Sequence, residues 1–151
     1  MAITLDEIER RVSAYNPSAD FAPLEAAYVF AERSHSGQMR NSGDPFITHP
    51  LAVCSALADL RLDMPTLVAG LLHDTVEDSS ATVEQLRSQF GDEVAALVDG
   101  VTKLGKIKFD SRDEAQSQNL RKMLIAMAKD IRVILIKLAD RLHNMHTIEF
   151  L

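Results

Sequence analysis

The segment LVAGLLHDTVEDSS, residues 67–80, is apolar in its first half and acidic in its second half. The apolar half, residues 67–72, predicts a helix that is packed in a protein core. If the helix continues through the acidic half, its charged side chains project from one end of one face or its flanks. Carboxylates gathered at the end of a buried helix would raise one another's pKa values unless a cation lay among them. The segment therefore predicts a divalent cation beside His73, Asp74, Glu77 and Asp78.

The composition restricts the kinds of protein that this chain can be. Its 151 residues are 46% apolar and 25% charged, which is typical of one soluble globular domain. The net charge of −6 argues against direct nucleic-acid binding. Cys54 is the single cysteine, so an intrachain disulfide and a Cys-rich zinc site are excluded, as expected in the cytoplasm. No run approaches the ~20 apolar residues of a membrane span, and the first residues lack a signal-peptide pattern.

Helical signals extend along almost the whole sequence. Capping-box pairs predict helix starts at Thr4 and Thr82, and prolines at 23, 50 and 65 suit the first turns of three more helices. Residues 37–48 predict a loop because they hold two glycines and a proline, and residues 106–118 are polar and poorly periodic. The fold class is therefore all-α, with roughly seven or eight helices.

The last predicted helix, residues 119–148, is either continuous or broken at Asp130. Its apolar residues recur with helical spacing, and a helix with such a stripe is expected to be packed. Asp140 lies in a neighbouring polar stripe and, if half-buried, needs a counter-charge from Lys137 or Arg141, or serves as a third metal ligand. The apolar positions are Ile131, Ile134, Leu135, Leu138, Leu142 and Met145.

Residue spacing alone does not identify the remaining ligands of the predicted cation site. His143 and His146 qualify as ligands by residue type, and either His35 or His49 could complete the set. His49 directly precedes Pro50 at a helix start, where the backbone is restricted. A mixture of imidazole and carboxylate ligands suits Mn²⁺, Fe²⁺ or Zn²⁺, and a larger share of oxygen favours Mn²⁺.

Four segments of the chain together resemble a known family. HSGQMRNSGDPFITHP, AGLLHDTVED, DGVTKLGK and DIRVILIKLADRLHNM, in this order, are similar to the hydrolase domain of RelA/SpoT-type enzymes. These enzymes belong to the His-Asp (HD) phosphohydrolase superfamily and degrade the alarmones ppGpp and pppGpp. The resemblance extends from about residue 20 to the end of the chain, and four long ordered motifs are far more specific than a His-Asp pair.

The resemblance implies a compact multi-helix HD-domain bundle that holds one Mn²⁺. It also implies hydrolysis of the 3′-pyrophosphate of ppGpp or pppGpp to GDP or GTP, by water that the metal activates. The intact HDxxED segment indicates an active hydrolase. Matched by position, the metal ligands are His49, His73, Asp74 and Asp140, and the catalytic carboxylates are Glu77 and Asp78. The guanine-nucleotide pocket matches Arg40, Asn41, Ser42, Asn144 and Thr147.

Two departures from the family pattern stand out. Asn41 occupies a position where many hydrolases carry a basic residue, so we expect one phosphate or base contact to be weaker. The synthetase and regulatory domains of long family members are not in this sequence, so we expect residues 1–151 to be one hydrolase domain at the front of a longer bifunctional protein. The alternatives are another HD-type nucleotide phosphohydrolase and a fragment that binds the alarmone without hydrolysing it.

Overall fold

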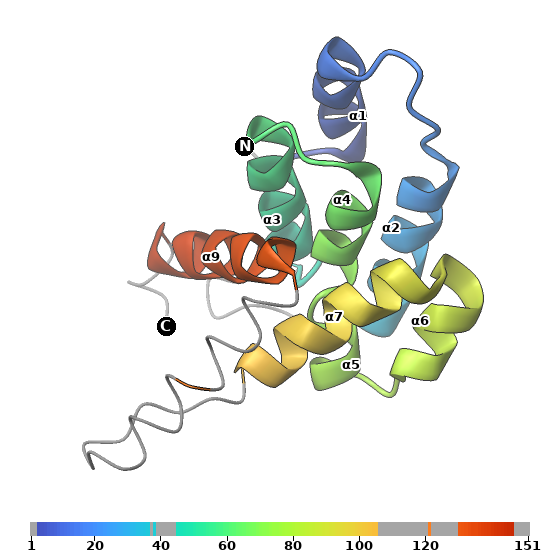
Figure 1. Cartoon of the computed structure of the whole chain (residues 1–151), viewed down its shortest axis with the longest axis vertical. Helices are drawn as coiled ribbons and strands as arrows, with labels where there is room; N and C mark the ends of the chain where they lie inside the picture. The colour runs from blue at the N-terminus through green and yellow to red at the C-terminus, as the bar shows by residue number, and fades with distance from the viewer. Residues whose placement is uncertain (1–2, 37, 39–44, 106–120, 122–129, 147–151) are drawn as a thin grey trace.

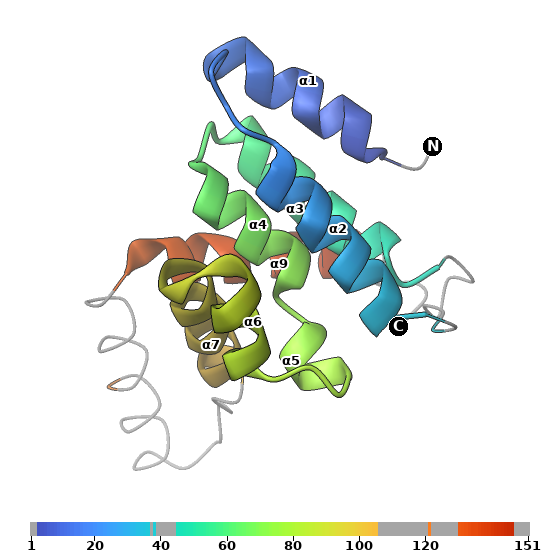
Figure 2. The same cartoon turned by 90° about the vertical axis from the view of Figure 1, so that its right-hand side faces the viewer.

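A computed structural model describes residues 3–36, 38, 45–105, 121 and 130–146 of the chain. These residues contain no β-strand, and their helices pack into one bundle, so the all-α prediction is confirmed (Figures 1 and 2). Each helix in this part of the chain is too short or too polar to span a bilayer. The helices are α1 (Leu5–Tyr15), α2 (Ala22–Ser34), α3 (Thr48–Asp59), α4 (Met64–Leu72), α5 (Thr75–Asp78), α6 (Val83–Phe90), α7 (Asp92–Gly105) and α9 (Ile131–His146).

Helix α4 forms the centre of the bundle. It packs against α2, α3, α7 and α9, and every residue from Thr66 to Leu72 is buried. A helix that is apolar on all sides is stable in water only when neighbours surround it. Each of its fully buried leucines contributes roughly 1.5–3 kcal/mol of hydrophobic stabilisation. The apolar half of the opening segment is therefore the core helix that the sequence predicts, and its C-terminal end is fixed on several sides.

The predicted continuation of this helix through Asp78 is wrong. The chain leaves α4 after Leu72 and re-enters a single helical turn, α5, at Thr75. The His73 ring donates a hydrogen bond from Nδ1 to the Gly70 carbonyl at 2.7 Å, and the Thr75 hydroxyl donates to the Leu72 carbonyl at 2.7 Å. A continuous helix would offer these same carbonyls to the N–H groups four residues later, so the two side chains compete with it.

Most predicted helix starts agree with the structure. Thr4 caps α1, and Thr82 forms a complete capping box with Gln85 at the start of α6. Pro50 lies in the first turn of α3, as predicted, and α3 begins at Thr48, which the sequence had placed at the end of a loop. Asp130 precedes α9 and accepts a hydrogen bond from the Arg132 N–H at 2.9 Å, which supports a helix start there. The predicted polar loop at 106–118 lies outside the described residues.

Helix α9 turns a different face to the core from the one that its apolar stripe predicts. Val133, Ile136 and Ala139 are buried, whereas Leu138 and Met145 of the predicted stripe are exposed. Asp140 shares the inward face and is only 5% exposed. Helix α9 packs across α3, α4 and α7, so this face meets the C-terminal end of the core helix.

Two glycines mark close helix contacts that respond differently to an added methyl group. A Cβ on Gly100 of α7 would lie 2.8 Å from Cγ2 of Val133, whereas a Cβ on Gly70 of α4 would lie 2.7 Å from Cδ1 of Leu57. The leucine methyl ends a flexible side chain, but the valine is branched at Cβ and has one preferred rotamer in a helix.

We therefore expect Gly100→Ala to lower the free energy of unfolding by about 1–3 kcal/mol through overpacking. Gly70→Ala is expected to cost less, because Leu57 can rotate and alanine favours the helix. Urea unfolding of both variants, followed by circular dichroism, measures the difference. A Gly100→Ala variant as stable as wild type would contradict the predicted clash between α7 and α9.

Arg132 joins the starts of three helices. Its guanidinium lies 2.7 Å from Oδ2 of Asp130, 2.9 Å from Oδ2 of Asp63 at the start of α4, and 2.7 Å from Oε1 of Glu93 in α7. The hydrogen bonds from Arg132 hold the pKa of Asp130 below its ordinary value of 3.8. When folding lowers the pKa of a carboxyl, its ionised form stabilises the folded state at every pH above the pKa that the group has in the unfolded chain. This stabilisation is lost as the pH falls to the lower pKa of the folded state.

Arg132→Met is accordingly expected to destabilise the chain by about 1 kcal/mol at pH 7, since the network is partly exposed. The difference from wild type should persist down to about pH 3.8 and shrink at lower pH. Thermal unfolding across this pH range measures it. Arg87→Met is the matched control, because Arg87 pairs with Glu84 and Asp92 on a more exposed surface. Equal losses in both variants would contradict a special role for the Arg132 network.

Candidate metal centre

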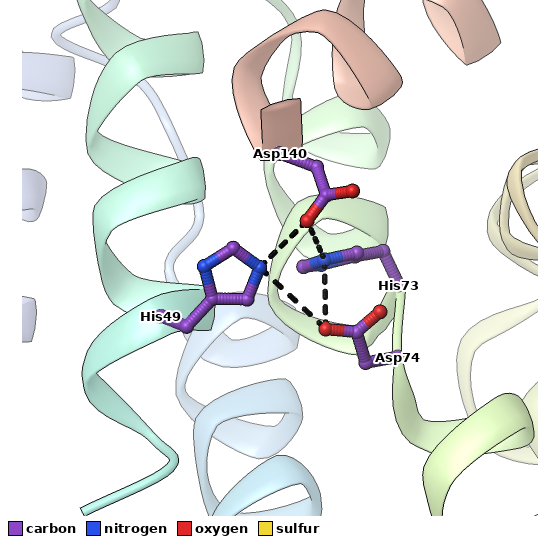
Figure 3. Close-up of side chains that lie close together, drawn as sticks. All are labelled: His49, His73, Asp74 and Asp140. Atoms are coloured by element: carbon purple, nitrogen blue, oxygen red, sulfur yellow. Dashed lines mark hydrogen bonds and ion pairs between the residues drawn. The ribbon is translucent and has the colours of Figure 1, made fainter. Parts of the chain in front are cut away.

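Four side chains from three separate segments converge at the C-terminal end of α4 (Figure 3). His49 comes from the first turn of α3, His73 and Asp74 from the corner between α4 and α5, and Asp140 from α9. Each residue offers one nitrogen or oxygen atom, and these atoms all lie within 4.8 Å of one another. They are the same four residues that the family resemblance implies, and their role as ligands stays a prediction.

The two histidines present the same nitrogen to the centre. Nε2 of His73 lies 3.0 Å from Oδ2 of Asp74 and 3.4 Å from Oδ1 of Asp140. Nε2 of His49 lies 2.7 Å from the same Asp140 oxygen and 3.6 Å from the same Asp74 oxygen. The bond from Nδ1 of His73 to the Gly70 carbonyl fixes that ring, so its Nε2 is directed inward.

Asp140 is positioned from its other side by neighbours on α9. Lys137, one turn earlier, places its ammonium group 3.1 Å from Oδ2, and the Asn144 amide lies 3.4 Å from Oδ1. Of the two counter-charges considered from the sequence, Lys137 makes the contact, and Arg141 is exposed. Because Lys137 contacts one carboxylate oxygen, the other is directed at the histidines.

The protonation states of the clustered side chains depend on one another. Burial alone would lower the pKa of His73, but the carboxylates of Asp74 and Asp140 raise it to about 10. Burial would raise the pKa values of Asp74 and Asp140, yet the adjacent imidazoles, with Lys137 beside Asp140, hold both below their ordinary range. Two ionised carboxylates in a largely buried site thus require positive charge at the centre, which a proton on His73 supplies in part.

These features fit a divalent cation. Two imidazole nitrogens and two carboxylate oxygens form a mixed donor set that suits Mn²⁺, Fe²⁺ or Zn²⁺. Asp74 and Asp140 carry the two negative charges that such an ion would balance. The outer contacts from Gly70 and Lys137 orient the donor atoms, as in metal sites generally. The cluster is therefore able to hold one divalent metal ion.

The two predicted catalytic carboxylates lie in α5, directly after the cluster, and both residues are exposed. Partial burial of its carboxyl, together with the negative charges of Asp74 and Glu77, raises the pKa of Asp78 to about 6. The Gln38 side chain donates to the Asp78 backbone carbonyl at 3.3 Å and so links the HSGQ motif to α5. Residue spacing gives no signal for this contact, because Gln38 and Asp78 are 40 positions apart in the sequence.

The other histidines take different places. His35 is 3% exposed and lies outside the four-residue group, with its ring tilted by 31° against that of Phe46 at a centroid distance of 4.3 Å. Burial lowers the pKa of His35. His143, considered as a ligand by type, instead contacts the outer nitrogen of His49. Asn144 is the predicted nucleotide contact that lies beside the cluster; Arg40, Asn41, Ser42 and Thr147 lie outside the described residues.

The fold and the cluster define a class of protein that sequence comparison also finds. A family model described as HD domain matches residues 27–150, which is most of the chain. The chain therefore belongs to the HD domain family. A solved structure described as a metazoan ortholog of SpoT that hydrolyses ppGpp superposes with a TM-score of 0.67 at 28% identity, covering 87% of this chain and 73% of that one.

Curated relatives confirm the resemblance to RelA/SpoT-type enzymes. The bifunctional (p)ppGpp synthase/hydrolase SpoT of Escherichia coli is 50% identical over 143 residues, which are 95% of this chain and 20% of SpoT. A GTP pyrophosphokinase of Streptomyces coelicolor is 56% identical over 150 residues, which are 97% of this chain and 18% of that protein. The chain thus spans about a fifth of the length of these relatives.

Proposed function

We propose that this chain hydrolyses ppGpp and pppGpp, releasing pyrophosphate from the 3′ position and leaving GDP or GTP. The observation that carries the proposal is the convergence of four potential ligand atoms within 4.8 Å at one end of the core helix, with two further carboxylates in the next turn. The names of the relatives support the choice of substrate. A guanine-nucleotide substrate agrees with the expected cytoplasmic location.

We propose Mn²⁺ as the ion that His49, His73, Asp74 and Asp140 hold, because half of the donor set is oxygen. When bound, such an ion lowers the pKa of water and offsets the charge of a phosphoryl group. The chain's own contribution is a rigid donor set, since two packed helices, α3 and α9, and the corner after α4 fix the four side chains before any ligand arrives.

The acidic pair in α5 supplies the proton acceptor in this proposal. Water attacks the phosphorus joined to the ribose 3′-oxygen, and the bond from this phosphorus to the 3′-oxygen breaks. Pyrophosphate is released, and the 3′-oxygen takes up a proton from solvent to become the hydroxyl of GDP or GTP. Glu77 and Asp78 orient this water, and the pair takes up its proton. We assign the nucleotide contacts to Arg40, Asn41, Ser42, Asn144 and Thr147.

Product analysis tests the proposal. The purified chain, incubated with ppGpp and Mn²⁺, is expected to release pyrophosphate and GDP in equal amounts, with no release after chelation. Deoxynucleoside triphosphates and cyclic dinucleotides form the comparison panel. Preferential hydrolysis of a panel member would contradict the substrate assignment, and binding of ppGpp without turnover at saturating Mn²⁺ would contradict the catalytic one.

A further inference from the structure

The outer edge of the His49 ring, which carries Nδ1, contacts a second histidine. His143 of α9 places its Nδ1 2.7 Å from Nδ1 of His49, and the two rings meet edge to edge, with their centroids 4.9 Å apart and an interplanar angle of 26°. On its other side, His49 directs Nε2 at Asp140. Because His143 follows Asp140 by three residues, one helical turn of α9 contacts both nitrogens of the same imidazole.

The short distance between the two Nδ1 atoms requires one proton between them, carried by one ring and accepted by the other. A neutral imidazole has one N–H and one lone pair. For Nε2 of His49 to offer its lone pair to a cation, Nδ1 of His49 must carry the proton. The neighbouring Nδ1 of His143 must then be the acceptor, with the N–H of His143 on Nε2.

We propose that His143 is a positioning residue: its Nδ1 accepts the hydrogen bond from Nδ1–H of His49 and holds His49 in the tautomer whose Nε2 faces the metal centre. This inference rests on the metal site of the proposed function. The Gly70 carbonyl does the same for His73 at the same distance of 2.7 Å. A carbonyl can only accept, whereas an imidazole accepts or donates, so His143 is the partner through which a substitution can change the tautomer.

Two substitutions separate the hydrogen bond from the packing. His143→Asn keeps an acceptor oxygen near the position of Nδ1, and His143→Phe keeps an aromatic ring without an acceptor. Leu142→Ala is the control for a change on α9, because Leu142 is 50% exposed. The free Mn²⁺ signal in electron paramagnetic resonance gives the dissociation constant of each variant.

We expect His143→Phe to weaken Mn²⁺ binding about 10–100-fold, as loss of an outer-sphere partner does in other metal sites. His143→Asn should recover most of this affinity, and Leu142→Ala should bind as wild type does. If the wild-type chain binds Mn²⁺ tightly and a folded His143→Phe variant binds it equally tightly, the role of His143 is overturned but the metal site is not. A wild-type chain that binds no Mn²⁺ would overturn the proposed metal site as well.

The tautomer of His49 can also be measured in the wild-type chain, so this test does not depend on the folding of a variant. In protein loaded with diamagnetic Zn²⁺, nitrogen-15 spectra should place the proton on Nδ1 of His49 and show a coupling across the hydrogen bond to Nδ1 of His143. A proton on Nδ1 of His143, with Nδ1 of His49 unprotonated, would overturn the proposal.

Discussion

Asp140→Asn is expected to lower the rate of pyrophosphate release from ppGpp by at least about a thousandfold. The substitution keeps the shape of the side chain but removes the negative charge on which His49 and His73 converge, at 2.7 Å and 3.4 Å. It also leaves the Lys137 ammonium without its buried counter-charge. We therefore expect Mn²⁺ affinity and turnover to be lost together.

The measurement is initial-rate hydrolysis across a range of Mn²⁺ concentrations, with circular dichroism to establish that the variant is folded. Asp99→Asn is the matched control, because Asp99 is a partly exposed aspartate of α7 that pairs with Lys103 at 2.9 Å. It should retain wild-type activity. A folded Asp140→Asn variant with near wild-type turnover at saturating Mn²⁺ would contradict the assignment of Asp140 as a ligand.

Asp78→Asn is expected to reduce kcat by about 10²–10⁴-fold, the range for loss of a general base. The raised pKa of Asp78, about 6, gives its carboxylate more basicity than an ordinary aspartate while leaving most of it ionised at neutral pH. Asparagine cannot accept the proton. Mn²⁺ affinity should change little, because Asp78 lies outside the group of four ligand atoms.

Glu77→Gln gives the comparison within the same helical turn. The charge of Glu77 raises the pKa of Asp78, so its removal should leave Asp78 ionised but a weaker base, with a smaller loss of kcat. Asp6→Asn, on the exposed surface of α1, controls for the loss of one negative charge. Steady-state kinetics measure both losses. A larger loss in Glu77→Gln than in Asp78→Asn would contradict the larger share within the pair that the raised pKa of Asp78 predicts for it.

The core and its relation to the cation site could be predicted from local sequence. A helix that is apolar on all sides must be surrounded, and residues 67–72 are so placed in α4. The abrupt charge after it indicated a site at its C-terminal end, where the cluster lies.

Features that depend on long-range packing could not be predicted from pattern. The break after Leu72 arises because His73 and Thr75 side chains bond to helix carbonyls, and residue spacing does not reveal such bonds. The apolar stripe of α9 predicted the wrong buried face, because the face that lies inward depends on how α9 crosses the other helices. Residue spacing could not decide whether His35 or His49 is the remaining ligand. The family resemblance implied His49, and the packing of α3 on α9 brings His49 to Asp140.

The most direct measurement is anomalous diffraction at the manganese absorption edge from crystals of the chain grown with Mn²⁺. We predict one strong peak enclosed by His49, His73, Asp74 and Asp140, with ligand distances of about 2.0–2.3 Å. Crystals with no peak among these four side chains, or with the ion bound elsewhere, would contradict the metal centre on which the proposed hydrolysis depends.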